Sequence, residues 1–190
     1  VKLPSGLTAI ERNLFASCNS LSEVAIPDSV TSIGYRAFAE CDSLTSITIP
    51  AGVTTIDSLA FDGCSNLTSA ALPYGLISIG DEAFRGCENL TSIAIPDSVT
   101  SIGQSTFWGC ERASSLTLSQ NLTTIGHSAF SGCASLTSVT IPDGVTGIET
   151  GMFSGCSSLA NIYIPVSAAY VSRSAFAGCE SLTDLYYGGS

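Results

Sequence analysis

Residues 21–41 read Leu21-x-x-Val24-x-Ile26-Pro27-x-x-Val30-Thr31-x-Ile33-Gly34-x-x-Ala37-Phe38-x-x-Cys41, and this pattern returns every 23 residues along the chain. Two columns of the repeat are complete. Phenylalanine fills one of them, at Phe15, Phe38, Phe61, Phe84, Phe107, Phe130, Phe153 and Phe176. Cysteine follows each phenylalanine by three residues, at Cys18, Cys41, Cys64, Cys87, Cys110, Cys133, Cys156 and Cys179. Self-similarity at one fixed period predicts a solenoid, in which each repeat buries its apolar face against the next.

Each repeat is expected to contain two extended segments. The alternation in Ile47-x-Ile49 predicts a short strand, and Pro50 ends it because proline has no N–H to donate to a ladder. A second apolar pair, Val53 and Ile56, predicts another extended segment on the far wall of the coil. Stacked copies therefore place parallel short strands on one face and a second extended segment opposite them.

The last part of each repeat is expected to be a short helical turn. Ile79, Ala83, Phe84 and Cys87 fall at helical spacings, and Gly86 suits the left-handed end of a short helix or 3₁₀ turn. The prediction is a right-handed α/β-type coil that forms one domain over residues 1–190. Eight repeats about 4.8 Å apart would give a rod or arc of roughly 40 Å.

Charge and composition exclude several classes of function. Only 12% of the 190 residues are charged, and 16 acidic against 6 basic residues give a net charge of −10. Nucleic acid and anionic lipid bind clustered Lys and Arg, so neither is an expected partner. No apolar run approaches the roughly 20 residues that span a bilayer, so this segment is not expected to insert into a membrane.

The full pattern, L-x-x-I-x-I-P-x-x-V-T-x-I-G-x-x-A-F-x-G-C, resembles the BspA-like leucine-rich repeat family over the whole chain. The resemblance implies a leucine-rich repeat solenoid that belongs to a secreted or cell-surface protein. It also implies a protein or glycan ligand, on host matrix or on another cell. Val1 aligns with Val24, inside a strand, so we expect this chain to be a fragment of a larger protein.

The eight cysteines are expected to form a ladder of free thiols. Equivalent side chains in stacked repeats are parallel and about 4.8 Å apart, whereas a disulfide needs Cβ atoms about 3.8 Å apart that face each other. A zinc site needs three or four convergent ligands, and His127 is the single histidine of the chain, in a variable column. His127 is interpreted as a surface residue with no neighbouring nucleophile, so no catalytic residue, metal or cofactor is expected.

The outward residues of the predicted strands form the candidate ligand-binding surface. One outward column contains Thr117, Thr140, Tyr163 and Tyr186, and clustered tyrosine is typical of binding hot spots. The alternative is that Tyr186, with its neighbour Tyr187, caps the open end of the core.

Trp108 is a further contact candidate, in a repeat that departs from the pattern. Ala113 replaces leucine and Ser119 replaces proline in this turn. Trp108 either fills the space left by Ala113 or lies exposed beside Arg85.

These patterns favour a non-enzymatic protein-binding or adhesion module, and the alternative is a passive stalk that displays another domain. A third interpretation, an ice- or glycan-recognition array of hydroxyl groups, is weakened because Ala25, Ala71 and Ala94 interrupt the threonine column.

Overall fold

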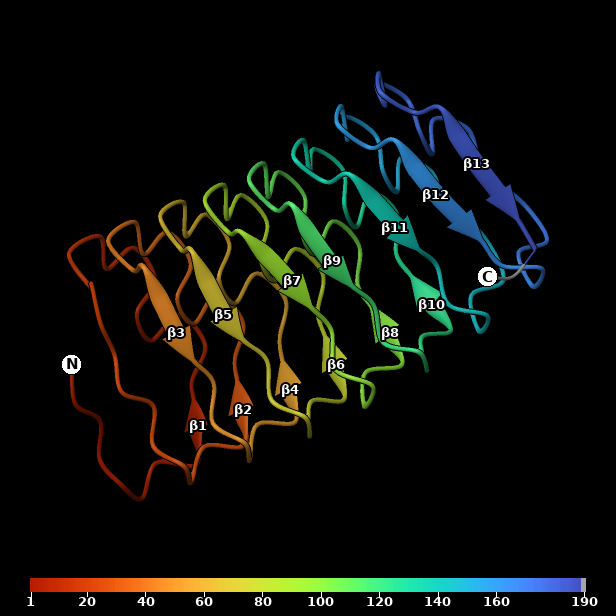
Figure 1. Cartoon of the computed structure of the whole chain (residues 1–190). Helices are drawn as coiled ribbons and strands as arrows, with labels where there is room; N and C mark the ends of the chain where they lie inside the picture. Colours follow the sequence, from red (N-terminus) through yellow and green to blue (C-terminus); the bar gives the residue numbers. More distant parts are fainter. Residues whose placement is uncertain (189–190) are drawn as a thin grey trace.

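The computed structural model describes residues 1–188 as a parallel β-solenoid of about eight turns, with one row of strands on each of two sides (Figure 1). The first row contains the segments predicted from the Ile-x-Ile pattern: β3 (Ser46–Thr48), β5 (Ser69–Ala71), β7 (Ser92–Ala94), β9 (Ser115–Thr117), β11 (Ser138–Thr140), β12 (Asn161–Ile164) and β13 (Asp184–Tyr187). The second row contains β1 (Ala9–Ile10), β2 (Ser32–Ile33), β4 (Thr55–Ile56), β6 (Ser78–Ile79), β8 (Ser101–Ile102) and β10 (Thr124–Ile125). The second extended segment is therefore present.

Every strand pair joins residues that are 23 apart, as the repeat period requires. Ser46 lies opposite Ser69 in the first row, and Thr55 lies opposite Ser78 in the second. The second row is one continuous sheet with the order β1-β2-β4-β6-β8-β10. The first row divides into β3-β5, β7-β9 and β11-β12-β13.

The first division of that row coincides with an irregularity in the core. Ala70 of β5 occupies the position that Ile47 and Ile93 hold in neighbouring repeats. A gap of about 10 Å³ remains beside Ala70, against Phe84 and Phe107. A small side chain in an otherwise isoleucine column therefore leaves the stack slightly underpacked where β5 and β7 fail to pair.

The predicted helical turn is wrong: no helix occurs within residues 1–188. Two residues in each of these turns have a left-handed backbone, such as Arg36 with φ 53° and Glu40 with φ 60°, and L-residues cannot continue an α-helix through them. Successive backbone N–H groups of the turn alternate between an acceptor in the same repeat and an acceptor in the next repeat. Ala37 donates to Gly34 within its own repeat, at 3.1 Å, while Phe38 donates across to Ala60 of the next repeat, at 2.8 Å.

Stacking distance explains why the turn takes this form. The rings of Phe38 and Phe61 are 5.2 Å apart between centroids, close to the spacing of adjacent strands. An α-helix with its side chains is about 10 Å wide and could not repeat at that spacing. A series of turns that bonds to the next repeat has a strand-like width, so this part of each repeat consists of turns and contains no helix.

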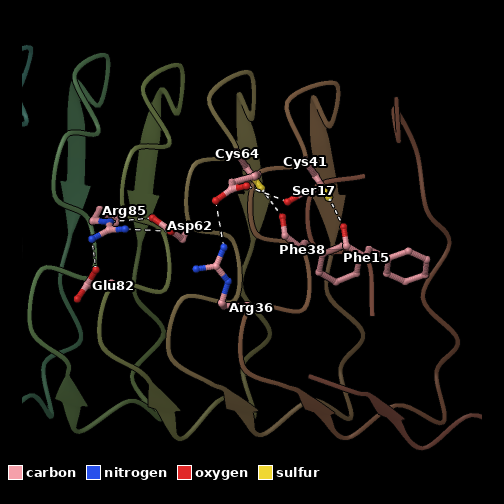
Figure 2. Close-up of polar contacts among 10 residues, drawn as sticks. Phe15, Ser17, Arg36, Phe38, Cys41, Asp62, Cys64, Glu82 and Arg85 are labelled. Atoms are coloured by element: carbon pink, nitrogen blue, oxygen red, sulfur yellow. Dashed lines mark hydrogen bonds and ion pairs between the residues drawn. The ribbon is translucent and has the colours of Figure 1, made fainter. Parts of the chain in front are cut away.

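The core consists of continuous columns. The eight phenylalanine rings stack with centroids 5.0 to 6.1 Å apart and interplanar angles of at most 14°. The thiol of each cysteine from Cys41 onward donates to a phenylalanine carbonyl of the preceding repeat, as Cys41 does to Phe15 at 3.1 Å and Cys64 to Phe38 at 3.0 Å (Figure 2). All eight cysteines are free thiols. The column therefore packs small apolar side chains and also gives each thiol an acceptor.

Part of the serine and threonine content forms hydroxyl ladders between repeats. The backbone N–H of Thr68 donates to the carbonyl of Thr45 at 2.8 Å, and the Thr68 hydroxyl donates to the same carbonyl at 2.9 Å. Thr91 repeats the arrangement on Thr68. Short hydroxyl side chains thus form hydrogen bonds between neighbouring repeats. Like-charged side chains stacked in the same column would repel one another. Among residues 1–188 no helix is long and apolar enough to cross a membrane.

Candidate ligand-binding face

Tyr163 and Tyr186 lie side by side on the first row of strands. β12 and β13 pair over four residues, and this register sets Tyr163 opposite Tyr186. Their rings stack with centroids 4.6 Å apart and an interplanar angle of 10°. Both remain open to solvent, with 36% and 46% of their surface exposed. The sequence column therefore becomes a pair of ordered aromatic rings at the surface.

Tyr187, the neighbour in the sequence, points elsewhere. Its hydroxyl donates to the carbonyl of Ala168 at 3.3 Å, although 64% of the residue is exposed. Ala168 belongs to the core. The contact to Ala168 fits the capping alternative for Tyr187, whereas the ring of Tyr186 lies against the ring of Tyr163.

A depression of about 230 Å³ opens beside Tyr163, where the strands of the first row end. Its lining brings together two of the predicted contact residues, Thr140 and Tyr163, with six others: Gln120, Ile141, Pro142, Asp143, Ile164 and Pro165. A second depression shares Gln120 and is lined by Leu72, Tyr74, Ala94, Ile95, Pro96, Asp97, Thr117 and Leu118. The shared residue joins the two into one feature, which we call the strand-end groove. It reaches from Tyr74 to Tyr163 and includes the predicted Thr117.

Charge in the strand-end groove has one sign. No Lys or Arg lines it, and its ionisable carboxylates are Asp97 and Asp143. The Asp97 carboxylate accepts the backbone N–H of Gln120 at 2.9 Å, which fixes its position. The Asp143 carboxylate is exposed and receives no hydrogen bond or ion pair from the part of the chain that the structure describes. An incoming donor or cation would therefore find Asp143 free.

Most residues of the groove were not predicted as contacts, and four of them are polar or aromatic residues of one column: Tyr74, Asp97, Gln120 and Asp143. All four occupy the column directly after the proline position of the repeat. That column varies strongly, and its variation is the signal that could have found them. Tyr74 is 93% exposed, the largest value among the apolar and aromatic side chains of residues 1–188.

Trp108 lies apart from the strand-end groove. It is 48% exposed and lines a depression with Arg85, so it does not fill the space at Ala113, which is itself buried. Arg85 is already engaged: its guanidinium donates to the buried Asp62 at 2.8 and 3.0 Å and also pairs with Glu82 (Figure 2). The structure therefore joins Thr117, Thr140 and the two tyrosines into one region, and places Trp108 outside it.

His127 lies at the surface in a polar cluster. Its Nδ1 is 3.3 Å from the carboxylate of Glu149, and the hydroxyl of Tyr170 donates to the same carboxylate. The three residues come from three successive repeats, and this hydrogen bond raises the pKa of Tyr170. Within residues 1–188 no group of three or more His, Cys, Asp and Glu side chains is arranged to hold a metal ion.

With the columns and their geometry established, comparison with known proteins decides the family. The family of BspA type leucine-rich repeat regions matches this sequence over residues 1–111 and 77–190, and the two matches together cover the chain. The chain belongs to this family. No curated protein is similar enough to count as a relative of this BspA-type chain.

Solved structures of bacterial proteins share the fold. The leucine-rich repeat protein of T. pallidum is 31% identical with a TM-score of 0.78, over 96% of this chain and 77% of that one. A leucine-rich cell surface protein of Faecalibacterium prausnitzii is 34% identical with a TM-score of 0.65, over 100% of this chain. A leucine-rich repeat protein of Bacteroides ovatus is 28% identical with a TM-score of 0.59, over 97% of this chain. The chain spans 59% and 60% of the length of the last two proteins.

Proposed function

We propose that the chain is a non-enzymatic protein-binding or adhesion module of a secreted or cell-surface protein, and that it contacts its ligand through the strand-end groove and the adjoining Tyr163–Tyr186 pair. The observation that carries the proposal is the depression at Thr140 and Tyr163, which adjoins two stacked and exposed rings. Tyrosine buries a large area at a low cost in side-chain entropy, so ordered tyrosines are effective contact residues.

Two further points support a surface module. The relative from Faecalibacterium prausnitzii is described as a leucine-rich cell surface protein. The stack also forms the groove from several repeats at once, and such extended surfaces are what solenoids use for binding. A protein ligand on host matrix or on another cell would fit this surface.

The alternative function is a passive stalk that displays another domain. Its support is the continuous bonding of the coil, because the second row of strands forms one six-stranded sheet and the core columns continue beside it. A stalk needs that rigidity but needs no ligand. The two functions differ in whether the repeats bind anything by themselves.

Binding of the whole chain to immobilised extracellular-matrix proteins and to cells separates the two functions. Tyr163→Ser should reduce capture at least about tenfold, as expected for a hot-spot residue. Tyr35→Ser, which removes a tyrosine outside the groove, is the matched control and should retain capture. Absence of binding by the unaltered chain at high concentration would support the stalk.

Thermal unfolding of Tyr186→Ser tests the capping alternative in the same preparation. If Tyr186 is a contact residue, capture falls while the melting temperature stays close to that of the unaltered chain. A large fall in melting temperature would instead show that Tyr186 covers the end of the core.

A further inference from the structure

We propose that the strand-end groove binds an extended cationic segment of a protein partner, with a Lys or Arg side chain held in the depression between Gln120 and Tyr163. This inference rests on the proposed function and specifies the chemistry of its ligand. It is carried by the groove's shape, by the side chains that line it and by the distribution of charge over the molecule.

The lining of the depression matches a long basic side chain. Ile141 and Pro142 provide apolar contact for an aliphatic stem, and such stems commonly lie on apolar surface while the charged end stays in contact with polar groups. Tyr163 supplies an aromatic ring to the same depression, and guanidinium groups favour aromatic faces. Thr140 adds a hydroxyl group that has no hydrogen-bond partner within residues 1–188.

Asp143 gives the depression its charge preference. Its carboxylate is exposed and unpaired among the described residues, unlike those of Asp62 and Glu40, which already hold Arg85 and Arg36. A cation that enters beside Asp143 therefore displaces no existing partner. A neutral glycan would leave this carboxylate without a counter-charge.

The distribution of basic residues over the chain also favours a cationic ligand. The chain has 6 Lys and Arg residues against 16 acidic ones, and none of the six lines the groove. Arg36 and Arg85 are in ion pairs, and Arg12 lies 5.2 Å from the ring centroid of Tyr35. At the groove itself an approaching cationic segment thus meets only acidic side chains, and such attraction raises the rate of association.

A second carboxylate explains why the segment should be extended. Asp97 occupies the same column as Asp143 two repeats earlier, so the two lie about 10 Å apart at the spacing of parallel strands. Three residues of an extended chain or of a polyproline helix span about the same distance. A partner with two basic residues three positions apart could place one at each aspartate, with Gln120 between them.

Fluorescence anisotropy with a defined probe tests the proposal on the whole chain. The probe is a labelled peptide, Ala-Pro-Arg-Pro-Pro-Arg-Pro-Ala, and its matched form has glutamine in place of both arginines. The arginine peptide should bind with an affinity that falls as salt rises, and the glutamine peptide should bind at least about tenfold more weakly. Asp143→Asn should weaken binding of the arginine peptide about threefold to fivefold, because it removes the charge of an exposed carboxylate and keeps the shape.

Asp28→Asn is the matched control, because Asp28 is an exposed aspartate of the same column outside the groove. It changes the net charge equally and should alter binding less than about twofold. Equal losses in the two variants would show unspecific attraction to an acidic protein and overturn the proposal. Equal binding of the glutamine peptide, or binding of neutral oligosaccharides alone, would overturn it as well.

The proposed function is tested separately. If Tyr163→Ser abolishes capture of matrix or cells while Asp143→Asn leaves that capture intact, the binding function stands and the cationic ligand is wrong. If the unaltered chain captures neither matrix nor cells yet binds the arginine peptide in an Asp143-dependent way, the groove chemistry stands and the adhesion function is wrong.

Discussion

The buried cysteine ladder should make the solenoid sensitive to alkaline pH. Cys110 is fully buried, and its thiol donates to the Phe84 carbonyl at 3.4 Å. Burial raises the pKa of this thiol from 9.0 to about 12, because the apolar core cannot solvate a thiolate. In the unfolded chain the thiol has its ordinary pKa and is free to ionise. The stabilising effect of the neutral thiol is therefore complete below pH 9 and is lost as the pH rises towards 12.

The size of the effect follows from the linkage between proton binding and stability. One pKa unit corresponds to about 1.4 kcal/mol, so raising the pH from 8 to 10 should lower the free energy of unfolding by about 1.4 kcal/mol for each such thiol. Six cysteines are buried, from Cys41 to Cys156, and burial raises the pKa of each one. Together they should cost about 8 kcal/mol, which is comparable to the whole stability of a typical domain.

Urea unfolding followed by circular dichroism, in the presence of a reducing agent, measures this loss at pH 8, 9 and 10. Cys110→Ala should be less stable than the unaltered chain at pH 8, and that difference should shrink by about 1.4 kcal/mol at pH 10. Val99→Ala is the matched control, since Val99 is equally buried and carries no ionisable group. A constant difference for Cys110→Ala across this range, or unchanged stability of the unaltered chain, would refute the neutral-thiol ladder.

Three further perturbations test the packing of individual repeats. Arg85→Ala leaves the buried Asp62 without its partner and should lower the free energy of unfolding in urea by about 2–4 kcal/mol. The double variant with Asp62→Ala should recover part of that loss, and additive losses would contradict a coupled pair. Ala70→Ile should fill the gap between repeats and gain about 1 kcal/mol by the same measurement, and a loss would show that the site cannot accept the longer side chain. Gly147→Ala places a Cβ on the ring of Tyr170 and should displace that ring. The displacement should change the tyrosine fluorescence spectrum, and an unchanged spectrum would contradict the close packing.

The repeat period determines most of the fold, and the exception has a physical cause. The phenylalanine and cysteine columns and both extended segments follow directly from the sequence, because each position has the same neighbour 23 residues away. The helical spacing of Ile79, Ala83 and Phe84 predicts a helical turn, and this prediction is wrong. Gly86 is left-handed as expected, with φ 68°, but Glu82 is also left-handed, with φ 58°. A non-glycine residue with that backbone gives no clear signal in the sequence.

The candidate face was predictable in part. Thr117, Thr140, Tyr163 and Tyr186 share a strand column, so their common orientation follows from the alternation of side chains in a strand. Their association with Asp143 could not be predicted in the same way. The bend after each proline is a local turn, in which the N–H of Val145 donates to the carbonyl of Pro142 at 3.0 Å, but the depression itself also needs Gln120 and Tyr163 from the neighbouring repeats.

Hydrogen-bond use separates the side chains that build the coil from those available to a ligand. The hydroxyls of Thr68 and Thr91 each donate to a threonine carbonyl of the preceding repeat, so they contribute to the stack and have little left to offer a partner. Thr140 and Tyr163 differ, because their hydroxyls have no partner within residues 1–188 and both line the strand-end groove. The ladder hydroxyls are therefore unavailable to a ligand, whereas those of the strand columns, such as Ser46 and Thr48, also have no partner within residues 1–188. A free hydroxyl alone does not mark a site, because Thr48 outside the groove has one as well. Recognition is assigned to the strand-end groove because the groove places Thr140 and Tyr163 beside the unpaired carboxylate of Asp143.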